Sequence, residues 1–240
     1  NRGHDDIVFF VEGPVTVADY LKQQNLKAVA IPENISVSDE RDILANYKRA
    51  DVIICEMLEC CLNRQAVFKK FSSKVVIFDD LLDNRYNVDL VISAQALPAY
   101  GNTEISSPKT KFEIGYKYFM MSSDFLAHTR KTREHSNAID SILIAFGGGS
   151  YDAAYLKSAR AIFDQEKSFK TTFVLGYDYN QDLADEILRE LPGAIIIGGV
   201  NNMAELMAQS DLAIVSAGYL KLEAAVTRTP AILIATQWHQ

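Results

Sequence analysis

Short apolar runs alternate with helical patterns along most of this 240-residue chain, and this alternation limits the possible folds more than any other feature. Repeated strand–helix–strand units place their strands in a mostly parallel sheet with helices on both faces. The sequence therefore predicts an α/β protein with doubly wound, Rossmann-like sheets. In the carboxyl-terminal half, the strand-like runs lie at 142–146, 172–175, 194–197, 212–215 and 231–235.

The amino-terminal half shows the same alternation, which breaks between residues 98 and 138. That stretch is rich in turn-forming and charged residues, which is typical of a crossing between domains. We therefore predict an amino-terminal α/β domain at residues 1–112, a linker at 113–138 and a carboxyl-terminal α/β domain at 139–240.

Composition limits the function classes. The chain has 24 Lys and Arg against 31 Asp and Glu, a net charge of −7, which argues against a general nucleic-acid-binding surface. Its three cysteines have no zinc-ligand spacing, and their odd number favours a reducing compartment. No apolar run approaches the ~20 residues that span a bilayer, and no signal peptide is visible. We expect a cytoplasmic protein without a metal or other cofactor.

A sharp turn of small residues, Ser216, Ala217 and Gly218, follows the run at 212–215. A helical pattern then begins, and this geometry directs free backbone N–H groups at one point, which favours a phosphate. Glu223, about one turn into the helix, is placed to accept hydrogen bonds from ribose hydroxyls. Tyr219 is placed either to stack on a ligand or to crowd it. An ordinary strand–helix connection is the alternative.

A second glycine turn follows the run at 142–146. Three consecutive glycines are entropically costly, and they are easiest to explain where side chains would block a ligand. A flexible surface turn is the alternative. Two such turns at strand ends within one α/β unit predict a single crevice for a phosphorylated ligand. The turn consists of Gly147, Gly148, Gly149 and Ser150.

Candidate acids and bases also follow strand-like runs. Asp79 and Asp80 come after the run at 75–78, and paired carboxylates can raise one pKa and supply a general acid or base. Helix capping is the alternative for this pair. His239 follows the last run, beside Gln240, and is a further candidate base, with a solvent-facing loop histidine as the alternative.

Ordered stretches over about two-thirds of the chain resemble GT-B nucleotide-sugar enzymes. The likeness is to the UDP-sugar hydrolase of pseudaminic acid biosynthesis and to its spore-coat polysaccharide relatives. The matching stretches are 76–92 with its Asp-Asp pair, 115–125 with Gly-Tyr-Lys-Tyr, 146–148 with Phe-Gly-Gly, and 202–240 with Gly218, Glu223, Pro230 and Gln240.

The resemblance implies an amino-terminal domain on the acceptor or catalytic side and a carboxyl-terminal domain that binds a UDP-sugar. It implies that Val200 and Met203 lie against the nucleotide base. The family's Gly-x-Gly-His turn has no counterpart here, so its catalytic histidine and the first strand–helix unit are expected to be missing. The implied activity is hydrolysis to UDP and a free amino-deoxy sugar. Sugar transfer to an acceptor and non-catalytic binding remain open, as does the oligomeric state.

Overall fold

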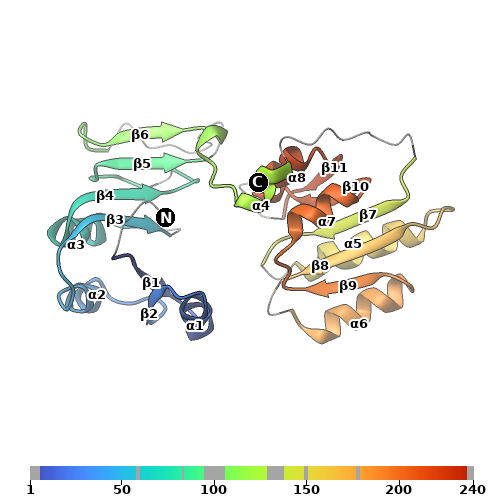
Figure 1. Cartoon of the computed structure of the whole chain (residues 1–240), viewed down its shortest axis with the longest axis horizontal. Coiled ribbons are helices and arrows are strands. Elements are labelled where there is room, and N and C mark those ends of the chain that lie inside the picture. Colours follow the sequence, from blue (N-terminus) through green and yellow to red (C-terminus); the bar gives the residue numbers. More distant parts are fainter. Residues whose placement is uncertain are drawn as a thin grey trace. The chain divides into compact units, whose positions relative to one another are not determined.

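The computed structural model describes residues 6–57, 60–82, 84–94, 106–128, 138–148, 151–176 and 179–236. The chain forms two compact units, Asn1–Phe119 and Met120–Gln240 (Figure 1). The boundary between them falls inside the segment predicted as a linker. In the described residues, no helix combines the length and the apolar character needed to cross a membrane.

The first unit contains two groups of parallel strands. β1 pairs with β2, and the other strands form a sheet in the order β3-β4-β5-β6. The elements are β1 (Val8–Glu12), α1 (Val15–Gln23), β2 (Lys27–Ile31), α2 (Val37–Leu44), β3 (Ala50–Glu56), α3 (Leu62–Phe71), β4 (Ser72–Phe78), β5 (Leu90–Ser93), β6 (Lys111–Ile114) and the 3₁₀ turn η2 (Tyr116–Tyr118).

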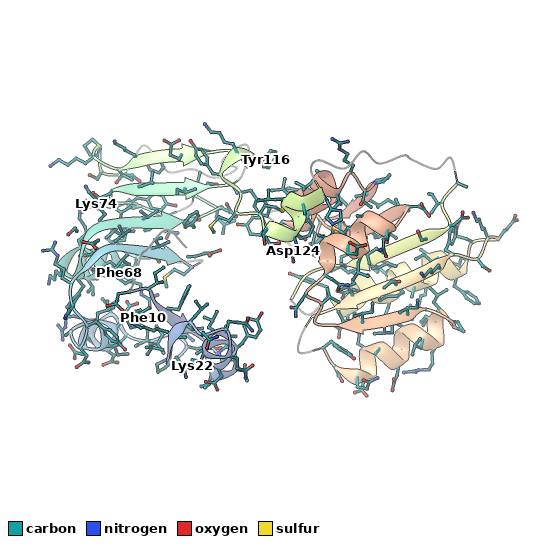
Figure 2. The ribbon with its side chains drawn as sticks, in the orientation of Figure 1. Phe10, Lys22, Phe68, Lys74, Tyr116 and Asp124 are labelled. Carbon is teal, nitrogen blue, oxygen red and sulfur yellow. The ribbon has the colours of Figure 1, made fainter. Side chains whose placement is uncertain are left out.

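The core of the first unit lies between α3 and one face of the larger sheet. Val75 and Ile77 of β4 are buried there with Phe68 of α3. Because side chains alternate along a strand, Val76 and Phe78 face the other side and are only partly buried. Phe10 of β1, labelled in Figure 2, also packs on this core. Its ring meets that of Tyr47 edge-on, with 5.0 Å between the ring centroids.

A buried ion cluster joins the β1–β2 pair to the helices. Arg64 of α3 donates from Nε to Glu40 of α2 at 2.8 Å, and its Nη2 lies 3.3 Å from a carboxylate oxygen of Glu12 at the end of β1. Arg64 and Glu40 are both buried. Removing one partner would leave an unpaired buried charge, so this cluster ties the three elements together.

The second unit is a single parallel sheet in the order β11-β10-β7-β8-β9. All its strands start and end within two residues of the predicted runs, which confirms the α/β prediction for this half. The elements are α4 (Ser123–His128), β7 (Ser141–Ala145), α5 (Asp152–Phe163), β8 (Lys170–Leu175), α6 (Gln181–Glu190), β9 (Ile195–Gly198), α7 (Met203–Gln209), β10 (Leu212–Ser216), α8 (Leu220–Thr227) and β11 (Ala231–Ile234).

Helices cover both faces of this sheet. Ile144 of β7 packs with α5 and α6 on one face, and Leu143 packs with α7 and α8 on the other. Phe125 of α4 is buried in the second of these cores. A described part of the predicted linker is therefore packed on the second unit.

Candidate functional site

The winding of the second sheet reverses between β7 and β10. From β7 the chain continues to β8 and β9 on one side, and it then returns to β10 and β11 on the other (Figure 1). Ligands of open α/β sheets bind outside the carboxyl ends of the strands at such a point. β7 and β10 are paired, with Ala145 opposite Val215, so the two predicted small-residue turns follow neighbouring strand ends.

The turn after β7 is open at Gly147 and Gly148, and it contacts the end of β8. Gly147 has a φ of +91°, which side chains rarely adopt, and a Cβ added at Gly147 or Gly148 would meet nothing within 4 Å. A Cβ on Gly176, at the end of β8, would instead lie 3.4 Å from the Gly148 Cα. The sequence interpretation missed Gly176, although a glycine directly after a strand-like run was a visible signal.

Tyr155 of α5 fixes the ends of the strands that carry these glycines. Its hydroxyl accepts a hydrogen bond from the Phe146 N–H at 3.1 Å and donates one to the Val174 carbonyl at 2.8 Å. The side chain is buried, and burial raises the pKa of Tyr155, which keeps the phenol neutral. The sequence interpretation did not single out this residue, because its partners lie nine and nineteen positions away.

The turn after β10 leads directly into α8. Ser216 is buried, and the Ala217 N–H donates to the Ile234 carbonyl at 2.9 Å, which holds the turn against β11. Gly218 is half-buried, and Tyr219 is exposed at the start of the helix. The backbone therefore enters α8 from a fixed position at the switch point.

Glu223 lies in the first turn of α8 and is half-buried. Burial raises its pKa to about 7. No described residue forms a side-chain hydrogen bond or an ion pair with this carboxylate, including the nearby Lys221 and Arg228. A partly buried carboxylate without a protein partner is available to bind a ligand.

Asp79 is engaged by the protein itself. Its carboxylate accepts hydrogen bonds from the Leu81 and Leu82 N–H groups at 2.9 and 3.1 Å. It also accepts from Asn84 Nδ2 at 2.8 Å and from the Tyr86 hydroxyl at 2.7 Å. These bonds hold the turn after β4, in which Leu82 has a φ of +53°. They give Asp79 a structural role, and its catalytic role remains a prediction.

Asp80 is half-buried, and its Oδ1 accepts a hydrogen bond from the Ala94 N–H at 2.8 Å. This bond links the turn after β4 to the end of β5.

Val200 is half-buried after β9, and Met203 begins α7. Four predicted site residues lie outside the described residues: Gly149, Ser150, His239 and Gln240.

Comparisons with known proteins give one sequence relative. No family model matches the chain. The uncharacterized protein MJ1062 of Methanocaldococcus jannaschii is 26% identical over 242 residues. The match covers 96% of this chain and 49% of that protein, so the chain spans about half the length of this relative.

Several solved structures are similar, and two of them are described here. MurG of Acinetobacter baumannii has a TM-score of 0.52 at 11% identity, over 97% of this chain and 78% of that chain. WaaG, a glycosyltransferase involved in lipopolysaccharide biosynthesis, has a TM-score of 0.44 at 14% identity, over 97% of this chain and 83% of that chain. Together with the parallel sheets of both units, the likeness to MurG identifies the fold as the GT-B-like α/β fold that the sequence predicted.

Proposed function

We propose that this protein is a GT-B-type enzyme that acts on a nucleotide-diphospho-sugar, with UDP as the nucleotide, and that its second unit binds the nucleotide. The observation that carries the proposal is the position of Glu223. This partly buried carboxylate has no partner among the described residues and follows the turn at 216–218, next to the switch point. A nucleotide supplies both an anion for the turn and hydroxyls for the carboxylate.

The diphosphate binds at the turns after β7 and β10. The Gly218 N–H and the N–H groups of the first turn of α8 are the proposed donors, because the Ala217 N–H is already bonded to Ile234, and Gly147 and Gly148 leave room for the diphosphate oxygens. Ser216 and Ala217 are proposed to line the turn beside it. A helix amino terminus stabilises an anion by only ~0.3–1 kcal/mol, so several donors must act together. Gly149, Ser150 and Tyr219 are proposed to complete this pocket.

The ribose and the base extend toward α8 and α7. Ionised Glu223 accepts hydrogen bonds from both ribose hydroxyls, and such charge-assisted bonds are stronger than neutral ones. Val200 and Met203 contact the base. Neither backbone polar group of Val200 bonds to another described residue, which leaves a donor and an acceptor for the edge of the base.

The proposed reaction is hydrolysis of the UDP-sugar to UDP and a free amino-deoxy sugar. A general base accepts a proton from the attacking water, and the bond between the sugar and the diphosphate breaks. Asp80 and His239 are the proposed bases, with Asp79 as the third candidate. Transfer of the sugar to an acceptor hydroxyl is the competing reaction of the same site, and nucleotide-sugar binding without turnover is the other alternative.

Two measurements test the proposal. Calorimetry with UDP should give saturable binding, and its absence at millimolar UDP would refute the nucleotide site. Incubation with a UDP-linked amino sugar and no acceptor should then release UDP. UDP release that strictly requires an added sugar or lipid acceptor would replace hydrolysis with transfer. Binding without release under either condition would identify a non-catalytic protein.

A further inference from the structure

The three cysteines of the chain lie within seven residues, where β3 leads into α3. Cys55 is near the end of β3, and Cys61 directly precedes the first residue of α3. All three are free thiols, but their surroundings differ. Cys55 is 5% exposed and Cys60 is 1% exposed, whereas Cys61 is open to solvent. The site therefore contains two enclosed thiols and one open thiol.

The two enclosed thiols contact each other. A hydrogen bond joins the Cys60 side chain to that of Cys55, and both side chains belong to the core of the first unit. The pairing of β3 with β4 sets the position of Cys55, which lies opposite Ile77 of this core. Gln65 of α3 donates from Nε2 to the Cys60 carbonyl at 2.6 Å. Strand pairing and α3 therefore hold the two thiols together in the folded protein.

Contact between two thiols favours a reaction that links them. Groups that a fold holds in contact react as though at very high concentration, so an oxidised sulfur would meet the other thiol before any thiol from solution. The first step is slow, because the hydrogen bond with Cys55 and burial raise the pKa of Cys60, and the thiolate is the reactive form. The Arg64 guanidinium acts in the opposite direction and favours the thiolate.

We propose that Cys55 and Cys60 form a redox modification site, which hydrogen peroxide converts into a disulfide, and that Cys61 stays outside it. The thiolate of one cysteine attacks the peroxide O–O bond, which gives a sulfenic acid and a hydroxide that takes up the proton lost by this thiol. The second thiol attacks the sulfenic sulfur, the S–S bond forms and water leaves. Two thiols are thus oxidised, and one peroxide is reduced to two water molecules.

The bond would lie in the core that supports the turn after β4. Leu82 and Tyr86 are buried in the same core as the two cysteines, and both donate hydrogen bonds to the Asp79 carboxylate. A covalent link between Cys55 and Cys60 would therefore act on the packing beside Asp79. The inference itself does not depend on the proposed function.

The test identifies which thiols the peroxide oxidises. The full chain is reduced, freed of reductant and treated with hydrogen peroxide, and its intact mass and its free thiols after unfolding are measured. The mass should fall by about 2 Da, the two hydrogen atoms lost in a disulfide, and the thiol count should fall from three to one. Cleavage after Glu56 separates Cys55 from the other two cysteines, so mass spectrometry of the fragments locates the bond.

Cys61→Ser is the matched control, because it removes the neighbouring cysteine and keeps the enclosed pair. It should form the disulfide at the parental rate and retain no free thiol. Cys55→Ser and Cys60→Ser should lose the reaction, and alanine at either position repeats the test if buried serine unfolds the protein. Thermal melting reports whether each variant is folded. In urea, where the fold no longer selects the pair, disulfides that include Cys61 should appear in the parent.

A disulfide that includes Cys61 in the folded parent would overturn the inference. Oxidation confined to Cys61, with oxygen added while Cys55 and Cys60 remain free, would overturn it too. The same holds if a folded Cys55→Ala variant still loses about 2 Da, because another pair would then have reacted. If the folded parent keeps all three thiols under conditions that oxidise them in urea, the enclosed pair is inert and the proposal is wrong.

Discussion

At the scale of single residues, Glu223 carries the strongest prediction. With a pKa of about 7, its carboxyl group is mostly protonated at pH 6 and mostly ionised at pH 8. Only the ionised form accepts from both ribose hydroxyls, so UDP affinity should rise over this interval. At pH 8, Glu223→Ala should weaken binding by ~1.5–3 kcal/mol, the range for a hydrogen bond to a charged group. Calorimetry at several pH values checks both statements.

Glu223→Gln provides the control for that pH dependence, because glutamine keeps the shape and does not ionise. Its UDP affinity should be lower at pH 8, and it should keep only the pH dependence that comes from ionisation of the terminal phosphate of UDP. A parent protein whose affinity changes with pH no more than that of Glu223→Gln would show that Glu223 does not bind the ribose. Unchanged affinity in folded Glu223→Ala would lead to the same conclusion.

The same carboxylate should lower the stability of the ligand-free protein. Burial raises its folded-state pKa from 4.5 to about 7, so ionisation is harder in the folded protein than in the unfolded chain. Stability is therefore lost as the pH rises from 4.5 through 7. Glu223→Gln should be more stable than the parent by ~1–3 kcal/mol at pH 8 and nearly equal at pH 4. Urea unfolding at both pH values measures the difference, and an equal difference at both would exclude this cause.

At the scale of elements, the turn after β4 offers a test of Asp79. Asp79→Ala removes the acceptor for four donors, including the hydroxyl of the buried Tyr86. We expect a loss of ~3 kcal/mol in the free energy of unfolding. Asp80→Ala, the comparison at the neighbouring carboxylate, loses the bond from Ala94 and the longer one from the Ser93 hydroxyl, and it leaves the Asp79 bonds in place. An inactive Asp79→Ala with parental stability would instead favour the catalytic assignment.

The helices and strands also differ in how far the sequence could predict them. Strands β7 to β11 were predicted because their apolar runs are short and rich in β-branched residues. Segments with helical periodicity separate these runs. The division of the first unit into the β1–β2 pair and the β3–β6 sheet was not predicted, because strand pairing depends on contacts between residues far apart in the chain. The turns at Gly147 and Ser216 were predicted as local patterns. Tyr155 was missed because its role depends on the pairing of β7 with β8, and Gly176 was missed although it directly follows a strand-like run.

At the scale of the whole molecule, each unit has its own core, and the proposed function assigns the two units different tasks. All proposed nucleotide contacts come from the second unit, whereas Asp79 and Asp80 belong to the first. If Asp80 is the base, binding and chemistry should be separable: changes at Glu223 should alter UDP affinity, and changes at Asp80 should alter turnover with little effect on affinity. A change at His239 that alters turnover alone would instead place the base in the second unit.

Residues 120–240 alone should fold and bind UDP within about threefold of the full chain, because α4 and both cores of the second unit are retained. A fragment of 138–240 loses Phe125, which is 5% exposed in the core formed with α7 and α8. Losing this ring should cost ~3–5 kcal/mol, as for Phe→Ala substitutions in cores. Phe125→Ala in the 120–240 fragment distinguishes the effect of losing this ring from the effect of losing the rest of α4. Thermal melting and UDP titration of the three proteins provide the measurement. A 120–240 fragment that folds but does not bind UDP would show that the first unit supplies essential nucleotide contacts.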